Sequence, residues 1–191
     1  MADIMAIEYG HYLAIQRGDL VMVRLACAFT GHRPRKFPWG YNEEDAGCKH
    51  LKAALQQEIA LLARNGYTDF LSGMAEGTDT WAALDVLELR EAHPELKLHC
   101  ILPCRTQADQ WTYPAQLCYR SILDQADSII YVSRDYNKSC MMERNRFLVD
   151  HAGLVLAVYN GEPRGGTAFT VRYAQRTGKQ VVLIDPEIYR E

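Results

Sequence analysis

The sequence alternates short, nearly continuous apolar runs with segments whose apolar residues recur at helical spacing. Six apolar runs predict strands, at residues 24–30, 68–71, 96–102, 128–132, 154–159 and 180–184. Such runs are typical of parallel strands covered on both faces. Because helical segments separate the strands, right-handed crossovers are expected between them. The sequence therefore predicts a single α/β domain with a doubly wound, mainly parallel, Rossmann-like sheet and helices on both faces.

Residues 1–22 fit this alternation poorly. Residues 1–16 have the spacing of a short amphipathic helix, which Arg17-Gly18-Asp19 would break. Two interpretations stay open: residues 1–22 are an N-terminal extension, or Met22 is the natural start and Gln16–Asp19 is a translated ribosome-binding site. Residues 23–191 are predicted to form one nucleotide-ligand-binding domain, a length that suits a single sizeable core.

Composition and charge narrow the classes of partner. The formal net charge is −3, from 21 Lys and Arg against 24 Asp and Glu, so we do not expect nucleic acid or an anionic membrane as a partner, although a local basic patch stays open. No apolar stretch reaches the roughly 18–20 residues that span a bilayer, and the N-terminus lacks a signal-peptide pattern. The six cysteines are scattered without zinc-site spacing. No metal is therefore expected, and reduced thiols in the cytoplasm are predicted.

Three glycine-bearing turns each follow an apolar run and precede a helical segment. They lie at residues 30–34, 72–79 and 162–167. A strand-to-helix turn exposes backbone N–H groups at a helix N-terminus, where phosphates and other anions bind. Because the carboxyl ends of parallel strands share one edge of a sheet, the turns are predicted to converge on one phosphate-bearing ligand.

The candidate ligand-binding residues come from these turns and from the helix before the fifth strand. They are Gly31, His32, Arg33, Ser72, Gly73, Glu76, Gly77, Thr78, Asp79, Arg144, Asn145, Gly165, Gly166 and Thr167. In this interpretation the glycines and Thr167 cradle phosphates, and Arg33 and Arg144 neutralise them. Glu76 and Asp79 repel phosphate, so they suit ribose hydroxyls or a base amine, or form a catalytic pair.

The same residues could have purely structural roles in place of ligand binding. Arg33 and Arg144 could be solvated, and Asp79 or Thr167 could cap the helix that follows. Trp111, after the third strand, would either stack on a base or pack in the core. The Lys-Ser/Thr ending of a Walker loop and the GxGxxG fingerprint are both absent from the sequence.

The segments 29–34, 71–83 and 145–150 resemble the YpsA-like family of the SLOG superfamily of Rossmann-like proteins. The resemblance implies a cytoplasmic protein that binds a nucleotide or nucleotide-derived ligand, such as an ADP-ribose or NAD derivative, as a sensor or sequestering protein. The resemblance leaves open whether the protein forms a homo-oligomer. Family members have been linked to cell-division control in some bacteria, so the resemblance also admits a protein-interaction regulator with a vestigial pocket.

Two related groups carry other activities. The LOG-type phosphoribohydrolases have Pro-Gly-Gly-x-Gly-Thr-x-x-Glu at the third turn, and the position of their glutamate is Thr170 here. A nucleotide N-glycosidase would therefore need Glu76 or Asp79 instead, and we favour binding without turnover. DprA-like proteins share the Ser-Gly-x-Ala-x-Gly-x-Asp pattern of residues 72–79 but load recombinase on single-stranded DNA, which needs a basic groove.

Overall fold

A parallel sheet of six strands forms the centre of the protein. The computed structural model describes residues 4–7, 11–16 and 19–190. The parallel strands follow the order β8, β7, β3, β4, β5, β6. Each overlaps one apolar run of the sequence, so the predicted six-stranded parallel sheet is confirmed. Their bounds are β3 Asp19–Gly31, β4 Tyr67–Ser72, β5 Lys97–Leu102, β6 Ser128–Tyr131, β7 Leu154–Val158 and β8 Gln180–Ile184.

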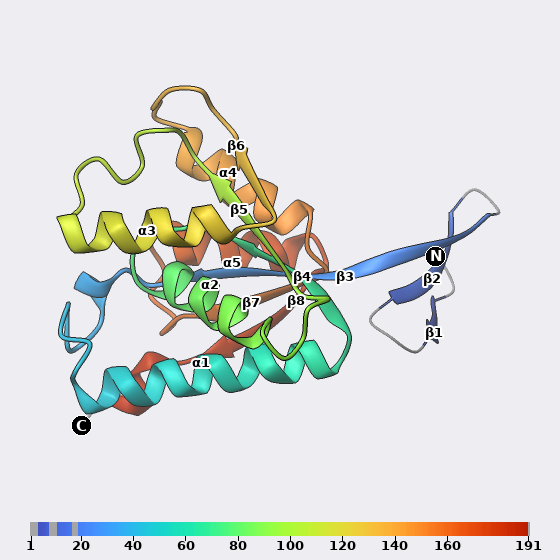
Figure 1. Ribbon diagram of the computed structural model, residues 1–191, viewed down its shortest axis with the longest axis horizontal. Helices are drawn as coiled ribbons and strands as arrows, with labels where there is room; N and C mark the ends of the chain where they lie inside the picture. Colours follow the sequence, from blue (N-terminus) through green and yellow to red (C-terminus); the bar gives the residue numbers. More distant parts are fainter. Residues whose placement is uncertain (1–3, 8–10, 17–18, 191) are drawn as a thin grey trace.

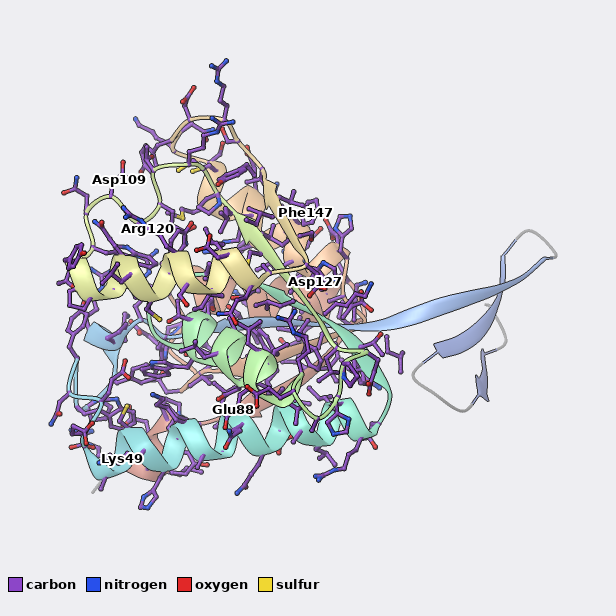
Figure 2. The ribbon with its side chains drawn as sticks, in the orientation of Figure 1. Lys49, Glu88, Asp109, Arg120, Asp127 and Phe147 are labelled. Atoms are coloured by element: carbon purple, nitrogen blue, oxygen red, sulfur yellow. The ribbon has the colours of Figure 1, made fainter. Side chains whose placement is uncertain are left out.

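Five helices cover the two faces of the sheet, which confirms the doubly wound architecture (Figure 1). α1, α2 and α3 pack on one face around one apolar cluster, and α4 and α5 pack on the other face around a second cluster. Figure 2 shows side chains filling the space between helices and sheet. The helix bounds are α1 Ala46–Arg64, α2 Thr78–Leu89, α3 Tyr113–Gln125, α4 Cys140–Asp150 and α5 Gly166–Arg176.

The direction in which strands are added reverses next to β3. From β3 the chain builds β4, β5 and β6 on one side, and then adds β7 and β8 on the other side. In open α/β sheets, ligands bind beyond the carboxyl ends of the strands at such a reversal. The reversal therefore marks the ends of β3 at Gly31 and of β7 at Val158 as the place to look for a candidate site.

Two further strands precede the parallel sheet. β1 (Ile4–Ile7) pairs with β2 (His11–Gln16), and β2 pairs antiparallel with residues 19–24 of β3. The helix expected over residues 1–16 is therefore wrong for the described part of that segment. An isolated helix of this length is marginal in water, whereas pairing with the long β3 gives the backbone hydrogen-bond partners. Figure 1 shows these strands as an arm that projects from the α/β body.

The boundary at residue 22 remains a prediction. We expect a chain starting at Met22 to keep its melting temperature within about 3 °C of the full chain. The reason is that β3 begins to pair with β4 only at Leu25 and with β7 only at Cys27, beyond the arm. Thermal unfolding followed by circular dichroism tests this. A chain starting at Phe29 is the control, because it loses part of the central strand and is expected not to fold. A drop of more than about 10 °C on removal of residues 1–21 would show that the arm stabilises the domain.

Candidate functional site

A pocket of about 330 Å³ lies at the predicted edge of the sheet, beyond the carboxyl ends of β3, β4 and β7. Most of the residues expected from the sequence line it: Gly31, His32, Arg33, Asp79, Arg144, Asn145, Gly165, Gly166 and Thr167. The lining also includes residues that sequence reasoning missed: Thr30, Arg35, Lys36, Ala75, Met141 and Arg164. Parts of all three turns and the start of α4 therefore meet at one pocket.

The remaining expected residues of the second turn lie behind the pocket lining. Ser72 is buried, and its hydroxyl donates to the Asp79 carbonyl at 2.8 Å and accepts from the Met74 N–H at 3.1 Å. The Thr78 hydroxyl donates to the His32 carbonyl at 3.2 Å. These bonds hold the second turn against the first turn. Ser72 and Thr78 thus shape the pocket without lining it.

Gly31 lies where the first and second turns approach each other closely. A Cβ on Gly31 would lie 2.3 Å from the Thr78 hydroxyl oxygen, well inside contact distance. Gly77 ends the second turn at φ +89°, where a side chain is strained. The turns can pack this tightly only because these positions lack side chains.

A buried ion pair forms the base of the pocket. Arg144 Nη1 donates to Asp79 Oδ2 at 3.0 Å, and both side chains are only 7% exposed. The Ala75 N–H also donates to Asp79 Oδ2, at 3.3 Å. Burial raises the pKa of Asp79, against the opposing charge of Arg144, and burial lowers the pKa of Arg144, against the charge of Asp79. The pair ties the start of α2 to α4.

Gly73 makes room for this pair. A Cβ at this position would lie 1.3 Å from Arg144 Nη1 and 2.9 Å from Asp79 Oδ2. Gly73 was expected to bind a ligand, but in the structure it accommodates the guanidinium of Arg144. Arg144 Nε is buried and has no hydrogen-bond partner among the described residues, although an arginine can donate five hydrogen bonds. Arg144 therefore keeps donor capacity beside the pocket.

The third turn delivers a helix N-terminus to the pocket. The N-cap of α5 is Gly165 at φ +105°, and no side chain caps the helix there. The first N–H groups of a helix have no partner inside it, so this end suits an anion. The Thr167 hydroxyl donates to the Gly31 carbonyl at 2.8 Å. Thr167 therefore fastens α5 to the end of β3.

Positive charge collects at the mouth of the pocket. Arg33, Arg35 and Arg164 are exposed there, and Lys36 forms an ion pair with Glu162. Sequence reasoning selected only Arg33 of these four. The signal that could have identified the others is their position beside the same two turns, within three residues of Arg33 or directly before Gly165.

Glu76 does not line the pocket, although Arg33 acts on it electrostatically. Partial burial raises the pKa of Glu76, and the charge of Arg33 opposes this shift. Thr170 is buried in α5, and its hydroxyl donates to the Gly166 carbonyl one turn earlier. The position of the LOG-type glutamate therefore presents no group to the pocket.

Comparison with known proteins places the chain in a family. The sequence model of the YspA SLOG family matches residues 27–187. The chain belongs to this family. A UPF0398 protein of Bacillus pumilus is 30% identical over 151 residues, 78% of this chain and 80% of the relative. A UPF0398 protein of Brevibacillus brevis is 30% identical over 138 residues, 71% of this chain and 73% of the relative. The resemblance seen in the sequence is confirmed.

Solved structures of DprA share the fold of this protein. DNA processing protein A from Helicobacter pylori aligns with a TM-score of 0.57 at 20% identity, covering 84% of this chain and 65% of that chain. The protein from Streptococcus pneumoniae aligns with a TM-score of 0.55 at 17% identity, covering 84% of this chain and 50% of that chain. The chain thus spans half to two thirds of these neighbours, and the likeness establishes the Rossmann-like fold.

The expectation about nucleic acid is corrected by this comparison. The Helicobacter pylori neighbour binds single-stranded DNA, which conflicts with the expectation that nucleic acid is not a partner. The physical reason is that a net charge of −3 is a sum over the whole chain, whereas phosphates respond to local charge. Here Arg33, Arg35, Lys36, Arg144 and Arg164 gather at one pocket.

In the part of the chain that the structure describes, no helix is long and apolar enough to cross a membrane. No group of three or more His, Cys, Asp or Glu residues there could hold a metal ion. All six cysteines are free thiols.

Proposed function

We propose that this SLOG-family chain binds the phosphate-bearing part of a nucleotide or nucleotide-derived ligand and acts as a sensor or sequestering protein. The observation that carries the proposal is the convergence of the α5 N-terminus and five cationic side chains on one pocket at the reversal of strand order. Backbone N–H groups and guanidinium groups are the usual partners of phosphate. The free cysteines are in keeping with a cytoplasmic location, which is part of the proposal.

Single-stranded DNA is a second candidate ligand, because a protein of the same fold binds it. A strand presents the same phosphate chemistry as a free nucleotide, but it needs an extended track of cations. The site here is a pocket in which the cations meet at one point. A free nucleotide is therefore the better match to the geometry.

The site is tested by a substitution that fits the backbone. Gly166→Asp places a carboxylate in the first turn of α5, and its Cβ would meet only Asn145 Nδ2 at an ordinary 3.5 Å. Since this carboxylate competes with phosphate for the helix N-terminus, we expect at least a tenfold loss of affinity for ATP and ADP-ribose, about 1.4 kcal/mol, by isothermal titration calorimetry. Gly153→Asp is the matched control, at the opposite end of β7, where a Cβ would meet only the Ala26 carbonyl oxygen at an ordinary 3.9 Å. Equal affinity in the two folded variants would place the site elsewhere.

Turnover distinguishes the sensor from an N-glycosidase. Glycosidic cleavage needs a carboxylate near the scissile bond. Because Thr170 is buried in a helical hydrogen bond, we expect no release of base from nucleoside monophosphates by chromatography. Steady release that disappears in Glu76→Gln or Asp79→Asn would instead establish the hydrolase. A folded protein that binds no nucleotide at all would favour an interaction protein with a vestigial pocket.

A further inference from the structure

The pocket carries far more positive than negative charge. Five cationic side chains line it, against the single carboxylate of Asp79, which leaves an excess of four. Lys36 is paired with Glu162, so an excess of three remains even without it. A phosphate monoester carries about −1.5 to −2 charges at neutral pH. One such group would leave about half of the excess uncompensated, whereas a chain of two or three phosphates would match it.

The pocket offers little to recognise a nucleobase. Base recognition relies on stacking against aromatic side chains or arginine planes and on apolar walls. Since the arginines of this lining are assigned to phosphates, aromatic and apolar side chains would have to recognise the base. Within the described residues, His32 is the only ring of the lining. It is 5% exposed, hydrogen-bonded to Asn160 at 2.8 Å and packed edge-on against Phe37 and Tyr159. The only larger apolar side chain of the lining is Met141.

The aromatic residue expected from the sequence to stack on a base, Trp111, does not line the pocket. Trp111 packs edge-on against Tyr119, at 5.3 Å between ring centroids, and lies against the apolar cluster under α1, α2 and α3. The structure therefore supports the core interpretation of this residue. No aromatic ring in the described lining of the pocket has an open face for a base.

The base of the pocket holds a donor without a partner. Arg144 is 94% buried, lines the pocket and has an unpartnered Nε, while its Nη1 is held by Asp79. A buried donor without a partner is unfavourable. An anionic oxygen that reached it would remove this penalty. The anion-binding character thus extends from the exposed mouth to the buried base.

Resting on the proposed function, we infer that the pocket selects its ligand by the number of consecutive phosphates and not by the base. The ligand class is a compound with a di- or triphosphate chain, whose base or other substituent stays outside. Phosphoryl oxygens lie between the α5 N-terminus, Arg144 and the three exposed arginines, and each added phosphate engages a further cation. Nucleotides and inorganic polyphosphates are two sources of this chemistry.

Calorimetry with the full chain tests the inference. The probes are ATP, GTP, CTP, UTP, AMP, tripolyphosphate, adenosine and an oligothymidylate without a terminal phosphate. We expect the four triphosphates to bind within about threefold of each other, tripolyphosphate within about tenfold of ATP, and AMP at least about tenfold more weakly. Adenosine is expected not to bind, and the oligothymidylate to bind more weakly than ATP.

Variants at exposed positions keep the test independent of folding. Arg35→Gln and Arg164→Gln are expected to reduce ATP affinity about fivefold each, and AMP affinity less. Arg134→Gln, an exposed arginine that does not line the pocket, is the control and should change neither. An unchanged ratio of ATP to AMP affinity in both pocket variants would overturn the inference.

The failures of the inference and of the proposed function are distinguishable. Selection among the four bases by more than about tenfold, or AMP as tight as ATP, overturns phosphate counting but leaves nucleotide binding standing. If the oligothymidylate binds more tightly than ATP, the site binds single-stranded DNA, and both the inference and the proposed function are overturned. Binding of none of the probes overturns both as well.

Discussion

Replacement of Arg144 by methionine is expected to reduce the free energy of unfolding by about 3–5 kcal/mol. The substitution leaves the Asp79 carboxylate buried at 7% exposure without its ionic partner. Urea denaturation at pH 7.5 measures the effect. The loss should shrink as the pH falls, because burial raises the pKa of Asp79 and protonation removes the unpaired charge.

Two further variants separate the ion pair from the rest of the arginine. Asp79→Asn in the Arg144→Met background should recover a large part of the lost stability, since no unpaired charge remains. Arg120→Met, at an exposed position on α3 (Figure 2), should change stability by less than about 0.5 kcal/mol. If Arg144→Met and Arg120→Met unfold at the same urea concentration, the buried pair does not stabilise the fold.

Replacement of Asp85 by asparagine is expected to raise stability at pH 8 by about 1–2 kcal/mol. Burial raises the pKa of Asp85 to about 7, with Lys52 opposing and Glu88 adding to the shift, and its Oδ2 is buried without a hydrogen-bond partner. Figure 2 shows Glu88, one turn further along α2, between α2 and α1. The folded state therefore holds a proton that the unfolded state releases near pH 4.

The sign of the pH dependence follows from this difference. Because the folded state binds more protons, Asp85 favours folding at low pH, and this stability is lost as the pH rises from about 4 to about 7. The advantage of Asp85→Asn should accordingly vanish near pH 4 and level off above pH 7. Asp124→Asn, at an exposed position on α3, is the matched control. An advantage of Asp85→Asn that is equal at pH 4 and pH 8 would contradict the titration of Asp85 as its cause.

The central strands were predictable because both of their faces are covered. The run at 68–71 became β4 (Tyr67–Ser72), and the run at 154–159 became β7 (Leu154–Val158), which is buried throughout. A parallel strand covered on both faces needs apolar residues throughout, so its sequence signal is strong. The arm formed by β1 and β2 was missed because the spacing of residues 1–16 also fits a helix, and only the pairing of β2 with residues 19–24 of β3 decides between the two.

The location of the pocket was predictable, but the roles of individual residues were less so. Glycine marks a turn in the sequence, yet Gly73 could be assigned to the Arg144 side chain only once α4 was in place, because the two are distant in the chain. Asp79 was expected to contact ribose or base, and in the structure its Oδ2 accepts from Arg144 and Ala75. Such pairings depend on tertiary packing, which residue type and spacing do not encode.

The hydrogen bond from Thr167 to Gly31 joins residues that are 136 positions apart in the sequence. During synthesis, therefore, a nascent chain that has already emerged as far as α4 still lacks one wall of the pocket. A ligand of this pocket cannot act as a template for the early strands. Because the complete pocket forms only once α5 has packed against the end of β3, occupancy would report on chains in which these two distant segments have come together.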